Sequence, residues 1–280
     1  MRELNEVVGL GIIGNIAKAE ESGDNFNRIA FSGYSDAPKG IYPFYAPVSE
    51  ESKFYNLRHF PLSTKKLKIP SVYDNIQAEP EVIIICDVKY HNDFVLNIVP
   101  KKFTAFNDAT IHRLTTHKIS ANKNWGSDSK GISNKWIDID NFREGGVLDR
   151  YSIVSFVKRN GRFENYTINT PVINYPTLHD GLVDWTLKRV NNQKEDSSLE
   201  SIREVLKDSG NPKKIAFSIG STEYTQFGQT NFIQDMDEIY IVLYDNTRYR
   251  PESIKAYLLA YGTRNVDYDG MIILHQTAYL

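Results

Sequence analysis

The sequence predicts an α+β domain dominated by β-strands, and three observations support this fold class. Short runs rich in Val, Ile and aromatic residues recur along the 280 residues, bounded by Gly, Pro and Asn, as is typical of strands. Helical spacing of apolar residues is confined to a few segments, including two consecutive ones at residues 178–194 and 198–206. Strands and helices do not alternate regularly beyond residue 45, which argues against a parallel α/β sheet.

Composition narrows the class of protein before any motif is considered. The formal charge of −2 gives no electrostatic footprint for nucleic acid or an anionic membrane. No apolar run approaches the roughly 20 residues needed to span a bilayer. The N-terminus, with two acids in its first six residues, does not resemble a signal peptide. We therefore expect a soluble, cytoplasmic protein, in which the lone Cys86 is a buried apolar residue rather than a metal ligand.

Three glycines near the N-terminus allow a different interpretation. Gly9, Gly11 and Gly14 have the Gly-x-Gly-x-x-Gly spacing of a dinucleotide-binding turn, and Asp36 is a candidate for the acid that would follow. Only two apolar residues precede the first glycine, and the segment after the third is short and polar. An NAD(P)-binding oxidoreductase therefore remains a distant third hypothesis.

The first half of the chain predicts extended structure. Residues 38–75 contain five prolines among aromatic residues, which excludes a long helix there. The apolar run at residues 82–88 predicts a buried strand, and the turn at residues 91–93 predicts a hairpin with residues 94–99 as its second strand.

The second half predicts a further hairpin and the helices. Asn160-Gly161 is a strong turn signal between strands at residues 151–158 and 163–168. The two helical segments named above follow. The remaining predicted elements are strands at 215–219 and 238–245, a short helix at 251–261 and a strand at 271–274.

Two acids stand at the entrance to the first buried strand. Because side chains alternate along a strand, Glu79 and Glu81 are expected on one face, about 7 Å apart. Two carboxylates on a buried face repel each other unless a cation or a proton lies between them. Pro80 indicates the start or edge of the strand. The alternative is a pair of solvated acids at a strand end.

Two further charged residues add to this pair. Asp108 either caps a helix beginning at Ala109 or supplies a third carboxylate. Lys130 ends a polar loop at residues 122–131. Three carboxylates suit a hard cation such as Mg²⁺, which keeps positions open for a bidentate 2-oxo acid. A lysine beside that open face could hold a substrate carboxylate or stabilise an enolate.

The order of these motifs resembles that of the fumarylacetoacetate hydrolase superfamily. Six segments carry the resemblance, together with the turn Gly11-x-x-Gly14-Asn15. The six are Glu79-Pro80-Glu81, Asn107-Asp108, Ser129-Lys130-Gly131, Asn160-Gly161, Gly220-Ser221-Thr222 and Asp235-Met236-Asp237-Glu238. The resemblance covers most of residues 7–245, and it explains the N-terminal glycines without a nucleotide.

The resemblance implies one homodimeric domain over residues 1–280, a mixed β-sheet roll with a helical insertion near residues 178–208. In it, residues 1–75 would pack on a core of residues 76–280. It also implies a site that takes Mg²⁺ or Mn²⁺ and a small carboxylate substrate, with no nucleic-acid or membrane partner. The implied metal ligands are Glu79, Glu81 and Asp108, with Lys130 polarising the substrate; the implied substrate contacts are Asn107, Arg113, Gly220, Ser221 and Thr222.

Departures from the family pattern leave the activity open. Ala19 stands where active members usually have a His that helps to activate water, and Arg113 lies one residue later than expected, after His112. Glu20 and His112 are the candidate replacement bases. The leading hypothesis is a metal-dependent hydrolase or lyase acting on a 2-oxo or β-dicarbonyl acid, by acylpyruvate hydrolysis or oxaloacetate-type decarboxylation. The second is a catalytically degenerate member that binds a metabolite or a protein partner.

Overall fold

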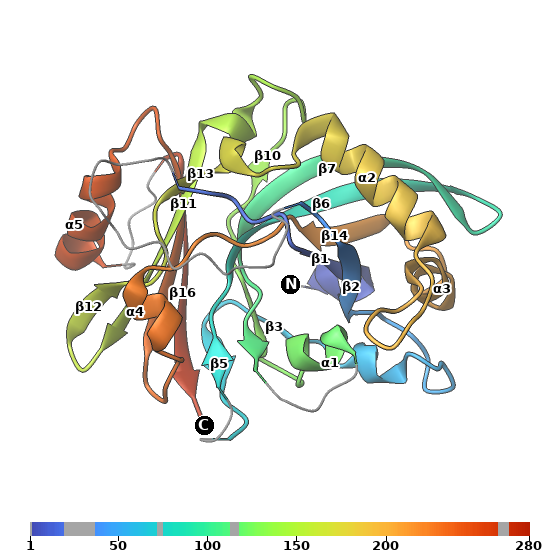
Figure 1. Ribbon diagram of the computed structural model, residues 1–280, viewed down its shortest axis with the longest axis horizontal. Helices are drawn as coiled ribbons and strands as arrows, with labels where there is room; N and C mark the ends of the chain where they lie inside the picture. Colours follow the sequence, from blue (N-terminus) through green and yellow to red (C-terminus); the bar gives the residue numbers. More distant parts are fainter. Residues whose placement is uncertain (1, 20–36, 72–74, 113–117, 263–268) are drawn as a thin grey trace.

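The computed structural model describes residues 2–19, 37–71, 75–112, 118–262 and 269–280, and their strands form two mixed sheets and a small third one (Figure 1). The first sheet has the order β2-β1-β14-β6-β7-β9-β3, with β10 beside β7. Its strands are β1 (Val8–Ile13), β2 (Gly40–Tyr45), β3 (Leu62–Ser63), β6 (Pro80–His91), β7 (Phe94–Asn107), β9 (Lys130–Ile132), β10 (Ile137–Asp138) and β14 (Lys214–Ser218).

The second sheet has the order β12-β11-β15-β16-β4, with β13 beside β11, and β5 pairs with β8 on their own. These strands are β4 (Lys66–Lys68), β5 (Ile76–Gln77), β8 (Thr110–Ile111), β11 (Tyr151–Arg159), β12 (Arg162–Asn165), β13 (Thr170–Pro171), β15 (Glu238–Asp245) and β16 (Met271–Tyr279). Parallel pairs (β1 with β14, β3 with β9, β4 with β16) occur among antiparallel ones. The predicted α+β class with mixed sheets is confirmed.

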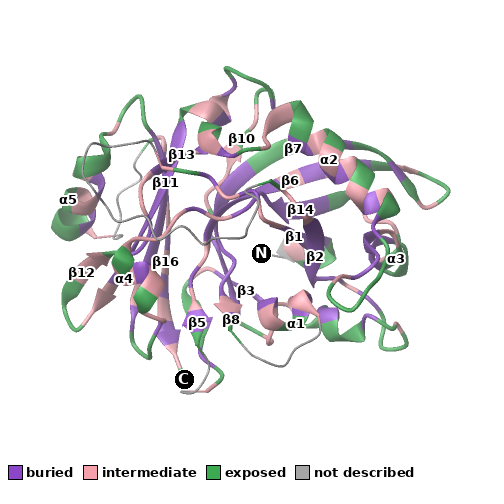
Figure 2. Cartoon of the chain, viewed as in Figure 1, coloured by how far each residue is buried: buried purple, intermediate pink, exposed green. Residues whose placement is uncertain are grey.

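The helices lie outside the sheets (Figure 1). They are α1 (Ile119–Lys123), α2 (His179–Asn192), α3 (Ile202–Asp208), α4 (Gln226–Thr230) and α5 (Pro251–Tyr261), with short 3-10 turns at Arg2–Glu6, Tyr55–Arg58, Val147–Arg150 and Val172–Asn174. Helix α2 packs along β7, and β7 also packs against β15 and β16, so the main apolar core lies between the layers. Figure 2 shows this burial pattern, with buried strands at the centre and exposed outer faces on α2, α3 and α5.

Both predicted hairpins are present. Asn92 and Asp93 turn the chain between β6 and β7, and Asn160 and Gly161 turn it between β11 and β12. All four residues have positive φ angles, between +46° and +77°, as a two-residue hairpin turn of the I′ type requires.

One helix is shorter than the sequence predicts, and another is absent. Instead of starting at residue 198, α3 begins at Ile202, because the Asp196 carboxylate accepts hydrogen bonds from the backbone N–H groups of Ser198 and Leu199 and holds them in a turn. Asp108 does not cap a helix, since strand β8 begins two residues later, at Thr110. None of the described helices is both long and apolar enough to cross a membrane.

The N-terminal glycines lie within a strand and do not form a dinucleotide turn. Strand β1 runs through Gly9 and Gly11 and pairs antiparallel with β2, with Gly11 opposite Tyr42. A Cβ atom on Gly11 would lie 2.2 Å from the Tyr42 ring, and one on Gly9 would lie 2.2 Å from the Phe44 ring. The glycines therefore make room for two aromatic rings, which corrects the nucleotide hypothesis; Asp36 lies outside the described residues.

We expect the Gly11→Ala substitution to destabilise the fold by about 1–3 kcal/mol, because the new methyl group overpacks a buried ring. Gly181 in α2 offers a matched control, since a Cβ there would meet no atom within 4 Å. The Gly181→Ala variant should be stabilised by about 0.5–1 kcal/mol. Urea unfolding of both variants tests this; equal stabilities would contradict the assigned role of Gly11.

Candidate metal centre and active site

Three carboxylates meet at the open end of the β6–β7 hairpin, opposite its turn. Glu79, Glu81 and Asp108 each offer one oxygen, and these three oxygens lie within 4.8 Å of one another. A backbone hydrogen bond holds the two chain segments together here: the Asp108 N–H donates to the Glu79 carbonyl at 2.9 Å. The two acids at the start of β6 and the acid just after β7 therefore come together.

Lys130 reaches the same point from the neighbouring strand. Strand β9 pairs with β7 so that Gly131 lies opposite Asn107, which brings Lys130 beside Asp108. Its ammonium lies 2.8 Å from Asp108 Oδ1 and also donates to the Ala109 carbonyl. Lys130 is fully buried, so its charge acts on the carboxylate with little screening from water.

Two hydroxyl groups complete the surroundings of the carboxylates. Tyr42 from β2 donates a hydrogen bond to Asp108 Oδ2, and Thr110 from β8 donates one to Glu79 Oε1. Neither residue stands out in the sequence. The signal for Tyr42 was available in the glycines of β1, because Gly11 lies opposite its ring.

A second lysine, which the sequence analysis also missed, lies between two of the carboxylates. Lys123, the last residue of α1, places its ammonium 2.7 Å from Glu79 Oε2 and 2.5 Å from Asp108 Oδ2. Only 7% of this residue is exposed. It belongs to the predicted polar loop, and nothing in its spacing distinguished it from Lys130.

Burial and the neighbouring charges shift the pKa values of these four groups in different directions. Burial, with the Asp108 charge next to it, raises the pKa of Glu81 well above its usual value. Burial also opposes ionisation of Asp108, but the two lysines outweigh it and lower the pKa of this carboxyl group. Burial lowers the pKa of Lys130 to about 8, whereas for Lys123 the carboxylate charges outweigh burial and raise the pKa.

The donor set suits a hard divalent cation. All three candidate ligands are carboxylates, the groups that Mg²⁺ and Mn²⁺ prefer. Glu81 is 2% exposed, and its Oε2 atom has no hydrogen-bond partner among the described residues. A buried carboxylate oxygen without a partner is costly, and a bound cation would satisfy it. The residues therefore fit a metal ion, although Lys123 already contacts one oxygen of Glu79 and one of Asp108.

Asn107 has a positioning role in this arrangement. Its side-chain oxygen accepts a hydrogen bond from the Glu79 N–H at 3.1 Å, and its side-chain nitrogen donates to Gln276 Oε1 at 2.9 Å. Both ends of the amide are therefore engaged, and its role as a substrate contact stays a prediction.

The segment Gly220-Ser221-Thr222 packs against the N-terminal turn. The Ser221 carbonyl accepts a hydrogen bond from Ala17 N, and Asn15 bonds to the carbonyls of Ile219 and Thr177. Asn15 has φ +57° and is fully buried. This turn therefore has a structural function, and the role of residues 220–222 as substrate contacts stays a prediction.

The candidate bases are only partly described. His112 follows β8; its Nε2 lies 3.0 Å from Gln77 Oε1, and its ring packs beside Phe232. Burial lowers the pKa of His112, while the nearby Glu79 charge opposes this shift. Glu20 and Arg113 lie outside the described residues. Ala19, where the resemblance expects a His, donates its backbone N–H to Glu223 Oε2 at 3.0 Å.

The segment Asp235-Met236-Asp237-Glu238, the last motif of the family resemblance, also stabilises the fold. The Asp237 carboxylate binds Arg159 through both oxygens, at 2.8 and 2.6 Å. This bidentate pair joins the start of β15 to the end of β11.

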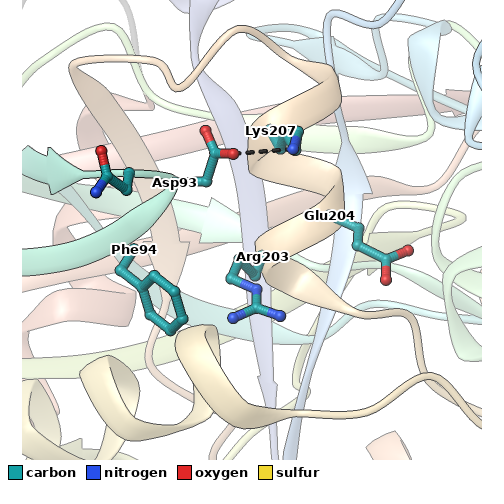
Figure 3. A pocket seen from close by; sticks show the side chains of 6 residues that line it. Asp93, Phe94, Arg203, Glu204 and Lys207 are labelled. Atoms are coloured by element: carbon teal, nitrogen blue, oxygen red, sulfur yellow. Dashed lines mark ion pairs between the residues drawn. The ribbon is translucent and has the colours of Figure 1, made fainter.

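A surface hollow of about 350 Å³ lies at the opposite end of the hairpin from the carboxylates. Here the turn residue Asp93 pairs with Lys207 of α3 at 2.9 Å, and Arg203 lies over the Phe94 ring (Figure 3). The length of β6, about 3.3 Å per residue over its 12 residues, separates this hollow from Glu81. The contact attaches the hairpin turn to α3 and is not part of the carboxylate site.

The sequence of residues 22–278 matches the family described as "Family of unknown function (DUF5718)". The chain belongs to DUF5718. No curated protein matches the sequence. The family description names no activity.

Several solved structures share the fold of this DUF5718 protein. A protein from Yersinia pestis CO92, assigned to the fumarylacetoacetate hydrolase family, superposes with a TM-score of 0.52 at 11% identity, over 97% of this chain and 92% of that one. Cg1458 with an inhibitor gives 0.51 at 15% identity, over 97% and 76%. A 2-keto-3-deoxy-D-arabinonate dehydratase complexed with magnesium and 2,5-dioxopentanoate gives 0.50 at 11% identity, over 97% and 73%. The predicted fumarylacetoacetate hydrolase fold is confirmed.

Proposed function

We propose that this DUF5718 protein is a metal-dependent enzyme that acts as a hydrolase or lyase on a small 2-oxo or β-dicarbonyl acid. The observation that carries the proposal is the meeting of three buried carboxylates with the buried ammonium of Lys130. The magnesium and dioxo acid in the dehydratase with the same fold support it. We further propose cytoplasmic localisation, a homodimer and a small carboxylate substrate, with no nucleic-acid or membrane partner.

Each residue of the cluster would have a distinct task. Glu79, Glu81 and Asp108 would hold Mg²⁺ or Mn²⁺, which when bound would polarise the oxo group and stabilise a developing enolate. Lys130 would hold a positive charge beside the substrate oxygen where negative charge develops. Tyr42 would keep Asp108 in place through its hydrogen bond.

The choice between the two reaction types depends on a base. Decarboxylation needs only stabilisation of the enolate, whereas hydrolysis also requires a group that activates water. His112 and Glu20 are the proposed candidates, with Arg113 and residues 220–222 as proposed substrate contacts. Of these two candidate bases, the structure describes His112. It lies close enough to Glu79 for the charge of that carboxylate to affect its pKa.

Oxalate binding tests the proposal, because oxalate imitates the enolate of pyruvate and chelates an open metal face. We expect calorimetry to detect oxalate binding in the presence of Mg²⁺ and none without it. Succinate, a dicarboxylate that lacks the adjacent oxygens for a five-membered chelate, serves as the control ligand. Oxalate binding that does not depend on Mg²⁺ would contradict the proposal.

A second function is favoured by Ala19 and by the position of Lys123. The methyl group at residue 19 has no base chemistry, and an ammonium already bridges two carboxylates. The alternative is a family member that binds an oxo acid or a protein partner without turning anything over. Metal-dependent oxalate binding without turnover of oxaloacetate or acylpyruvates would favour this alternative.

A further inference from the structure

Lys123 reaches the carboxylates from a segment that is anchored on both sides. On the N-terminal side, Lys118 donates to the Asp196 and Leu199 carbonyls, and Ser120 donates to Glu200 at 2.5 Å. On the C-terminal side, Asn124 donates to two backbone carbonyls, those of Phe44 and His59. The position of Lys123 is therefore set by the fold of α1 and is not that of a loose surface side chain.

The ammonium of Lys123 covers part of the site and leaves part of it open. It contacts one oxygen of Glu79 and one of Asp108, and it lies 5.2 Å from the centre of the Tyr42 ring. Glu81 Oε2 has no hydrogen-bond partner among the described residues. The lysine thus satisfies two of the three carboxylates in the absence of a metal.

We propose that Lys123 is a resident cation of this site, which holds Glu79 and Asp108 together in the metal-free protein and competes with the divalent ion for their oxygens. This inference rests on the function proposed above. A metal ion bound about 2.1 Å from the carboxylate oxygens would lie within a few ångströms of the ammonium. Two cations at that distance in a buried site repel strongly, so binding of the ion would require the flexible end of the Lys123 side chain to move away or to lose its proton.

Removing the lysine tests this competition directly. We expect the Lys123→Met variant to bind Mn²⁺ at least ten-fold more tightly than the wild-type protein, measured by calorimetry and by the paramagnetic resonance signal of free Mn²⁺. The Lys102→Met variant is the matched control, because it removes the same charge from an exposed side chain that pairs with Asp138 and contacts none of the three carboxylates. Its affinity should stay within two-fold of wild type.

The outcomes separate this inference from the proposed function. If all three proteins bind Mn²⁺ equally, the metal site stands and the role of Lys123 is overturned. If only Lys123→Met binds Mn²⁺, the lysine does block the ion, and the proposed metal-dependent function fails. Absence of binding in all three proteins overturns both ideas.

Folding of the variant provides a second measurement. Without Lys123, three carboxylates face one another with Lys130 as the remaining cation among the described residues in contact with them. If Lys123→Met does not fold in metal-free buffer, millimolar Mn²⁺ should restore its circular dichroism spectrum, since the ion replaces the missing charge. Failure of Mn²⁺ to restore the fold would overturn the inference.

Discussion

The Glu81→Gln variant is expected to bind divalent metal about 100-fold more weakly, or worse, while keeping its fold. The substitution preserves the size of a side chain that is 2% exposed and removes the negative charge that a hard cation requires. Even changes to residues that merely support metal ligands cost about 10–100-fold in affinity. Calorimetric titration with Mn²⁺ measures the loss, and urea unfolding checks the fold.

Glu200→Gln is the matched control for this substitution. Glu200 is also buried, at 5% exposure, and it accepts a hydrogen bond from Ser120 on α1, but it is not one of the three carboxylates that meet. Its variant should bind Mn²⁺ like the wild-type protein. If Glu81→Gln retains wild-type affinity, or if both variants lose it equally, then Glu81 is not a metal ligand.

The sequence indicated which carboxylates would meet, but it could not supply the register that brings them together. With its turn at residues 92–93, a regular hairpin would place residue 106 opposite Glu79. Two bulges, at Leu96 and Lys101, each add one residue to β7, so that Asp108 takes that position. Bulges depend on tertiary packing as well as on sequence. The residues alone therefore left Asp108 as either a helix cap or a third carboxylate, and the family resemblance implied the second role.

Lys123 and Tyr42 were missed for a different reason. Tyr42 lies 66 residues before Asp108 and Lys123 lies 15 residues after it. A lysine in a polar loop or a tyrosine in an aromatic segment has many ordinary roles. Alternation along one strand gave the relation between Glu79 and Glu81, because that relation is local. Contacts between β2, α1 and β7 are not local, and the periodicity of the sequence does not predict them.

The Lys130→Met variant is expected to lose turnover by about 1,000-fold, in line with the loss of a buried charge that stabilises a developing anion. Oxaloacetate decarboxylation provides the assay. The substitution also removes one partner of the fully buried Asp108, which costs about 3–5 kcal/mol of folding stability. Turnover must therefore be measured below the unfolding temperature of the variant, established by circular dichroism.

Measuring metal binding together with turnover shows whether Lys130 acts on the substrate or only supports the fold. Lys130 pairs with Asp108 Oδ1, whereas Lys123 occupies Oδ2 of the same carboxylate. Removing Lys130 leaves the three carboxylates intact, so Lys130→Met should still bind Mn²⁺ at least as tightly as wild type. The Lys102→Met variant, which removes an exposed lysine outside the site, controls for the lost charge and should turn over oxaloacetate normally. Turnover by folded, metal-loaded Lys130→Met within ten-fold of wild type would show that the ammonium does not act on the substrate, because the ion alone would then stabilise the enolate.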